Sequence, residues 1–173
     1  MPEGAVQTSP TGWVKRVLVG RDPRRTLARL VVWVAICLLV PKFLIIPIRV
    51  HGISMMPTYK EGRVNFVNRL AYAFHQPRRG DPVAIRLAGE HVMYLKRIIA
   101  LPGETVEFRH GRVYINGQRL NEDYVQYPCA WNHPPENVGP NEYYVVGDNR
   151  SMDFSEHYQG KAWRSQIVGK TLL

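Results

Sequence analysis

Residues 83–99, VAIRLAGEHVMYLKRII, predict two antiparallel strands joined by a short turn. The segments 83–87 and 91–99 are rich in β-branched, aliphatic and aromatic residues, a composition typical of strands. Ala88-Gly89-Glu90 between them has the composition of a turn. Two strands joined by so short a connection pair as an antiparallel hairpin, so this stretch predicts an antiparallel β fold.

Strand and turn patterns on both sides of this hairpin extend the prediction. Short β segments are expected at residues 49–53, 63–68, 106–108, 113–115 and 143–146. Asn116-Gly117 is a strong hairpin turn signal, and four prolines predict a loop over residues 127–141. Residues 70–75 fit either one helical turn or a continuation of the preceding strand. The fold class predicted is mainly β, with an antiparallel domain of about 120 residues that is large enough to bury a core.

Lys96 lies on the second strand of the 83–99 hairpin. Alternate strand residues share a face, so Lys96 points the same way as Val92, Tyr94 and Ile98. A lysine on an apolar face loses hydration, which disfavours its charged form. Its pKa can then fall from about 10.4 towards 7–8, where the amine acts as a general base. The alternative is an ordinary surface lysine, which is what most lysines are.

Ser54 supplies a matching nucleophile in the stretch 52–58, GISMMPT. A serine hydroxyl that attacks an amide needs a base, and a neutral lysine can replace the more usual histidine. Gly52 allows close approach of a backbone. The polar segment 147–153, GDNRSMD, offers groups that could hold a Ser54–Lys96 pair in place.

An apolar segment precedes these motifs. Residues 30–48 are apolar except for Lys42, and as a helix they would span roughly 28 Å, close to the thickness of a bilayer. Residues 1–29 carry six basic and two acidic residues, which favours a cytoplasmic N-terminus. We therefore expect a disordered cytoplasmic tail at 1–26, one transmembrane helix at 27–48 and an extracytoplasmic catalytic domain at 49–173. A buried helix of a soluble protein is the alternative.

Composition and residue spacing disfavour two other classes of protein, those that bind nucleic acid and those that bind metal. The net charge of +9 could indicate a nucleic-acid partner, but no helix-turn-helix, zinc-finger or RNA-binding pattern accompanies it. The six histidines lack ligand spacing such as His-Glu-x-x-His, so no metal or other cofactor is expected.

Three blocks in this order resemble bacterial-type signal peptidase I, over roughly residues 27–169. They are Ser-Met-x-Pro-Thr at 54–58, Lys-Arg-Ile-Ile-x-Leu-Pro-Gly-Glu at 96–104, and Gly-Asp-Asn-Arg at 147–150. The resemblance implies a membrane-anchored serine protease that removes signal peptides. It makes Ser54 the nucleophile and Lys96 the base.

The resemblance also implies supporting residues around the dyad. Ser151 and Asp153 match a family Ser-x-Asp pattern, in which the serine orients the lysine. We expect Asp153 to pair with Arg97, and Asp148 to lend further support or to cap a turn. The spacing before Ser151 is two residues shorter than in the family, and residues 154–156 replace the usual Ser-Arg. Ser155 is therefore a possible substitute for Ser151.

The expected substrate is an extended segment with small side chains around the cut, of the Ala-x-Ala kind. It would add as a strand beside residues 49–53 and 92–95, with Ile53 and Tyr94 as pocket walls. Gly52 replaces a serine that supplies an oxyanion donor in some relatives, which leaves the Ser54 backbone N–H as the donor. Gly52, Ile53 and Tyr94 are thus the predicted substrate-binding residues.

The predicted function is signal-peptide cleavage at the bacterial inner membrane by a monomer whose partners are precursor proteins and membrane lipid. A specialised relative that matures pilins or conjugation proteins is one alternative. A membrane-tethered domain that binds peptides without cutting them is another.

Overall fold

The computed structural model describes residues 23–86, 93–155 and 160–172, except for the side chains of Pro23 and residues 39–43. The chain divides into two compact units, residues 1–43 and 44–173. The predicted turn at 88–90 lies outside the described residues.

Helix α2, Pro23–Leu44, occupies much of the segment that the sequence predicts as an anchor. Proline suits the first turn of a helix, where a backbone N–H has no helical partner. Within the described residues, we find no helix whose length and apolar character are sufficient for crossing a membrane. The transmembrane helix predicted at 27–48 stays a prediction.

The predicted end of the anchor at residue 48 is wrong as a helix boundary. Residues Ile45–Arg49 form strand β1, which pairs with β2, Val64–Asn68, over five residue pairs. Pro47 cannot donate a helical hydrogen bond, but an outer strand tolerates it. The β segment predicted at 49–53 therefore lies earlier in the chain, and residues 50–53 form no strand.

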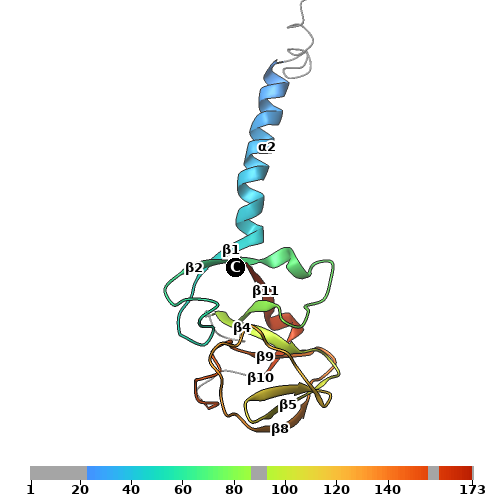
Figure 1. The fold of residues 1–173 in the computed structure, drawn as a ribbon. Helices are drawn as coiled ribbons and strands as arrows, with labels where there is room; N and C mark the ends of the chain where they lie inside the picture. The colour runs from blue at the N-terminus through green and yellow to red at the C-terminus, as the bar shows by residue number, and fades with distance from the viewer. Residues whose placement is uncertain (1–22, 87–92, 156–159, 173) are drawn as a thin grey trace, which may run out of the picture. The chain divides into compact units, whose positions relative to one another are not determined.

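A seven-stranded antiparallel sheet builds most of the second unit, in the order β1-β2-β11-β3-β4-β9-β10 (Figure 1). The remaining strands are β3 Pro82–Arg86, β4 Met93–Ala100, β9 Glu142–Val146, β10 Gly160–Trp163 and β11 Ile167–Leu172. The hairpin of β3 and β4 confirms the pairing predicted from residues 83–99. Strands β10 and β11 were not predicted from the sequence. Residues 69–72 form a short 3₁₀ helix, which decides between the two alternatives for that segment in favour of a helical turn.

A four-stranded antiparallel sheet, in the order β7-β6-β5-β8, completes the unit. Its strands are β5 Thr105–Arg109, β6 Arg112–Ile115, β7 Gln118–Arg119 and β8 His133–Asn137. Asn116 and Gly117 both have positive φ, 51° and 79°, as the predicted hairpin turn requires. The prediction of a loop over residues 127–141 is wrong in part, because residues 133–137 form strand β8. That strand lies at the edge of the sheet and has an irregular register, where prolines without an N–H are tolerated.

Strands β4 and β9 are shared by two apolar clusters of the core. Ile99 and Val146 pack with buried residues of the small sheet, including Phe108 and Val113. The alternate residues, such as Ile98, pack into a second cluster with β3 and β11. Because β4 is packed on both faces, residues near its middle lie in fixed positions, and Lys96 is one of them.

Candidate active site

Ser54 and Lys96 lie within hydrogen-bond distance of each other, although 42 residues separate them in the chain. The Lys96 Nζ donates to the Ser54 Oγ at 3.0 Å. Lys96 comes from the middle of β4 and only 2% of it is exposed, whereas Ser54 is half-buried in a turn. The structure therefore brings together the predicted nucleophile and the predicted base.

Burial changes the protonation of Lys96. Loss of hydration lowers the pKa of its amine from 10.5 to about 8, and the nearby Asp148 carboxylate opposes this shift only in part. An amine with such a pKa is partly neutral near neutral pH. It can accept a proton from the Ser54 hydroxyl, to which it is already hydrogen-bonded.

The turn that carries Ser54 is held from both sides. Asn149 donates its backbone N–H to the Ser54 carbonyl at 2.9 Å and its side-chain amide to the Ile53 carbonyl at 3.1 Å. Gly52 has φ of +87°, a conformation that favours glycine. Beyond the serine, Met55 packs with other buried residues of the same segment and with Leu95 of β4. These contacts fix Ser54 against the strand that carries Lys96.

Arg97, next to Lys96 on β4, forms a two-pronged ion pair with Asp148. Its Nε and Nη2 donate to the two Asp148 carboxylate oxygens at 2.8 and 2.6 Å. The Thr58 hydroxyl adds a third hydrogen bond to that carboxylate at 2.6 Å. Asp148 is fully buried, so the pair links β4, the segment after β9 and the Ser54 segment. Asp148 thus does more than cap a turn.

The expected pairing of Asp153 with Arg97 is wrong. Asp153 is exposed, and its carboxylate accepts hydrogen bonds from the backbone and hydroxyl of Ser155. The Ser151 hydroxyl donates to the Asn149 side chain at 2.7 Å. Within the described part of the chain, neither Ser151 nor Ser155 is hydrogen-bonded to Lys96. Both serines are exposed, whereas Lys96 is buried.

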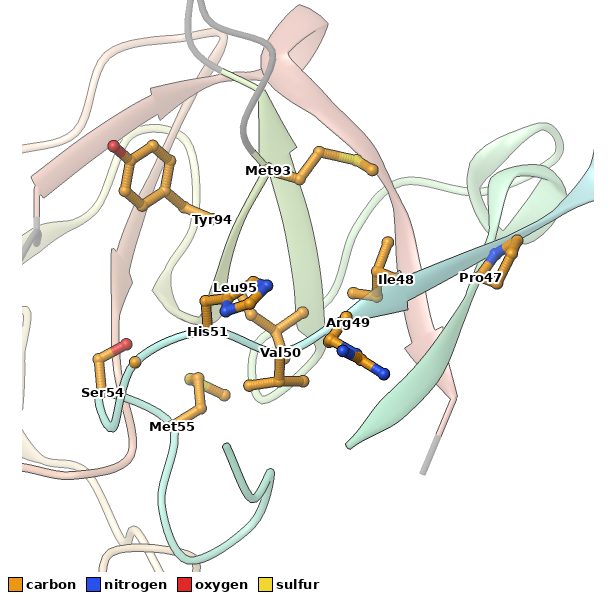
Figure 2. Close-up of a pocket in the computed structure, with 11 residues that line it drawn as sticks. Pro47, Ile48, Arg49, Val50, His51, Ser54, Met55, Met93, Tyr94 and Leu95 are labelled. Carbon is orange, nitrogen blue, oxygen red and sulfur yellow. The ribbon is translucent and has the colours of Figure 1, made fainter. Parts of the chain in front are cut away.

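A groove of about 360 Å³ opens beside Ser54. Its lining comes from residues 47–52, from Ser54 and Met55, and from the start of β4 at residues 93–95, and Figure 2 shows these side chains around the opening. Tyr94 lines the groove as predicted. Gly52 lines it too, whereas Ile53 is 45% exposed and is not part of the lining.

Two contacts of this site were not predicted from the sequence: the hydrogen bond from Thr58 to Asp148, and those by which Asn149 holds the Ser54 turn. Both residues belong to motifs that carry the family resemblance, Ser-Met-x-Pro-Thr and Gly-Asp-Asn-Arg, so the motifs were the available signal. Among the described side chains, no group of three or more His, Cys, Asp or Glu residues could hold a metal ion. The site's chemistry is that of a hydroxyl, an amine and a buried ion pair.

Comparison with known proteins identifies the family. The model of the family "Signal peptidase, peptidase S26" matches residues 24–173. A signal peptidase I of Leptolyngbya laminosa is 37% identical over 128 residues, which cover 69% of this chain. This chain spans only 63% of that relative's length. Signal peptidase I S of Bacillus subtilis is 37% identical over 153 residues, 81% of this chain and 82% of the relative.

Among solved structures, a signal peptidase I from Enterococcus faecalis has a TM-score of 0.45 and 31% sequence identity, and the match covers 56% of this chain and 97% of that one. The family model covers most of the chain, including the strand and the turn that carry Lys96 and Ser54. The chain therefore belongs to the signal peptidase family, peptidase S26.

Proposed function

We propose that this protein is a membrane-bound serine endopeptidase that removes signal peptides from exported precursors, with Ser54 as nucleophile and Lys96 as general base. The observation that carries the proposal is the 3.0 Å hydrogen bond between the Lys96 Nζ and the Ser54 Oγ, made by a lysine that is 2% exposed. Membership of the family and relatives named signal peptidase I support the substrate class.

In the first half of the reaction, the neutral Lys96 amine takes the proton of the Ser54 hydroxyl. The Ser54 Oγ forms a bond to the carbonyl carbon of the scissile peptide. When the tetrahedral intermediate collapses, the carbon–nitrogen bond breaks and the Lys96 ammonium gives its proton to the leaving amine. The signal peptide is then held on Ser54 as an ester.

In the second half, Lys96 is neutral again and takes a proton from a water molecule that attacks the ester. The ester bond breaks, the proton returns to the Ser54 Oγ, and the signal peptide leaves as a carboxylic acid. The backbone N–H of Ser54 is the proposed donor to the oxyanion that forms in each half. The Asn149 contacts to residues 53 and 54 support this role because they fix the turn.

The groove beside Ser54 is the proposed binding site for the Ala-x-Ala end of the signal peptide. It lies between the segment leading to Ser54 and the first residues of β4, so an extended peptide can lie alongside both. Its mainly apolar side chains, among them Val50, Met55 and Leu95, suit small apolar substrate residues.

The proposed membrane tether is the helical segment that precedes β1. The described apolar side chains of α2 are mostly exposed: Leu27, Leu30, Val31, Val32, Trp33, Val34, Ile36 and Leu38. So many exposed apolar side chains on one helix favour a lipid environment. The basic residues before the helix would lie on the cytoplasmic side. The second unit, residues 44–173, which we call the β unit, would then lie outside the cytoplasm of a bacterial cell.

The test is a cleavage assay with the purified full chain in lipid vesicles and a precursor whose signal peptide ends in Ala-x-Ala. We expect one cut after the second alanine, lost in Ser54→Ala and retained in Ser165→Ala, which changes an exposed serine on another segment. If Ser54→Ala cleaves as fast as the wild type, the proposed nucleophile is wrong.

The substrate range separates the proposal from its alternatives. A general signal peptidase cleaves many exported precursors, whereas a specialised maturation peptidase cleaves one pilin or conjugation protein and leaves the others intact. A non-catalytic peptide-binding domain binds the same peptides in wild type and Ser54→Ala alike, and cuts none.

A further inference from the structure

A loop that the predicted function does not use lies against the buried ion pair of the candidate active site. We call residues 121–127 the clamp loop. The Tyr124 ring covers the flat face of the Arg97 guanidinium, with the Arg97 Cζ at 4.1 Å from the ring centroid. The Tyr124 hydroxyl donates to the Glu122 carboxylate at 2.7 Å. Burial raises the pKa of Tyr124 above its usual range, so this hydroxyl keeps its proton.

The clamp loop is anchored to the segment that carries Asp148. Glu122 forms an ion pair with Arg150, which is 1% exposed, and the Arg150 Nε donates to the Gly147 carbonyl at 2.9 Å. Tyr127 also forms a bridge with Asn149. These contacts form a closed ring. They lead from Arg97 through Tyr124, Glu122 and Arg150 to Gly147, which is next to Asp148, and the Asp148 carboxylate is in turn paired with Arg97.

Arg97 is held in the plane of its guanidinium and on one face. Its Nε and Nη2 bind Asp148, its Nη1 donates to the Gly80 carbonyl at 2.6 Å, and Tyr124 covers its face. Arginine forms such stacked and two-pronged contacts together because its guanidinium is planar. The stack therefore restrains motion of the guanidinium out of its plane towards Tyr124, a motion that the in-plane hydrogen bonds do not prevent.

We propose that Tyr124 is a positioning residue for the Ser54–Lys96 dyad, because its ring keeps Arg97 against Asp148 and keeps water away from both. This inference rests on the proposed function for its effect on cleavage. Arg97 neutralises the Asp148 carboxylate. Without Arg97, the negative charge of Asp148 would stabilise the protonated form of the neighbouring Lys96. Without the ring, Asp148 is less well neutralised and water reaches the pair, and both changes favour the charged form of Lys96.

Among the described residues, the Ser54 hydroxyl is hydrogen-bonded to Lys96, and the Asp148 carboxylate acts on its charge. Arg97 pairs with Asp148, and the rings of Tyr59 and Tyr124 act on Arg97 in turn. The negative charge of Asp148 raises the pKa of Lys96. A change in the Arg97–Asp148 pair therefore gives Tyr124 a route to affect Lys96.

The test compares Tyr124→Leu, which removes the ring, with Tyr124→Phe, which keeps the ring and removes only the hydroxyl. The matched control is Tyr114→Leu, which removes a similar stack under the exposed Arg109 on the small sheet. We expect Tyr124→Leu to lower kcat/KM at pH 7 by about 3–10-fold, with recovery at pH 9–10, since the neutral fraction of Lys96 rises with pH. Tyr124→Phe and Tyr114→Leu keep the wild-type pH profile.

A second measurement does not depend on cleavage. NMR titration of the Lys96 side chain in the full chain should show a higher pKa in Tyr124→Leu than in wild type, and no change in Tyr124→Phe. Tyr124→Met provides the same comparison if the leucine variant does not fold. An unchanged Lys96 titration in a folded, ring-less variant overturns the inference. If wild type shows no cleavage while the titration shifts as expected, the proposed function fails and the positioning role stands.

Discussion

Lys96 differs from a surface lysine in its burial and in its partner. Its amine is almost completely removed from water and donates to a hydroxyl 3.0 Å away. Burial stabilises the neutral amine, which is the form that general-base catalysis requires. The sequence predicted this burial from the apolar residues around Lys96 on its strand. The identity of the hydroxyl partner depends on the tertiary fold.

Replacing Lys96 tests the proposed base directly. Lys96→Arg should lower kcat by roughly 100-fold or more, because a guanidinium does not lose its proton in this pH range and the general base is lost. Lys96→Met, which removes the amine without burying a new charge, should have the same effect on kcat and should keep the wild-type circular dichroism spectrum. Near-normal turnover in either variant would rule out Lys96 as the base.

The pH profile of the wild type should reflect the same amine. Because the base works only when neutral and its pKa is about 8, kcat/KM should rise about tenfold per pH unit below that value and level off above it. Steady-state cleavage of an Ala-x-Ala peptide between pH 6 and 10 measures this rise in kcat/KM. A profile that is already flat from pH 6 upward contradicts a lysine base with this pKa.

At the scale of elements, β4 and the segment after β9 are joined by one buried ion pair. Arg97 from β4 and Asp148 meet through two short hydrogen bonds, and the Asp148 carboxylate also receives the Thr58 hydroxyl. β9 itself pairs with β4 from Arg97 to Ala100. The ion pair therefore continues the contact between the two segments at the point where β9 has ended.

Asp148→Ala should destabilise the fold by roughly 3–5 kcal/mol, because it leaves the buried Arg97 guanidinium without a counter-charge. Glu107→Ala is the matched control, since it removes the partner of Arg109 on the surface of the small sheet, where water solvates the charge. Urea unfolding of both variants gives the comparison. Equal midpoints for the two variants would show that the buried pair contributes no more than a surface pair.

The whole molecule combines a β unit with a helical segment of different character. In the β unit, apolar side chains fill two core clusters on either side of β4 and β9. In α2, the described apolar side chains from Leu27 to Leu38 are largely exposed. The proposed tether accounts for this difference, because lipid and not protein would cover the helix.

Val34→Arg tests the proposed tether. A charged residue near the middle of a membrane-spanning helix costs about 2.5–3.5 kcal/mol, so the variant should move from the membrane fraction to the supernatant after alkaline carbonate extraction. Wild type should stay in the pellet. Arg86→Ala, on the β unit, serves as a control and should fractionate as wild type. A wild type that carbonate releases completely would contradict the tether.

Local patterns were sufficient for much of the fold, and together with the family resemblance they singled out Ser54 and Lys96 as a candidate pair. The β3–β4 hairpin, the Asn116-Gly117 turn and β9 follow from composition and alternation over a few neighbouring residues. Strand β8 could not be predicted in this way. Its two prolines indicate a loop, and only its place at a sheet edge makes them compatible with a strand.

The sequence by itself determined a mainly β protein with Ser54 and Lys96 as a candidate pair, because strand patterning and motif composition are local properties. Only the tertiary structure decided that Arg97 pairs with Asp148 and not with Asp153, and that Tyr124 covers it. These partners come from segments that are distant along the chain. Which of several carboxylates reaches a buried guanidinium depends on where the strands place their ends, and no local pattern contains that information.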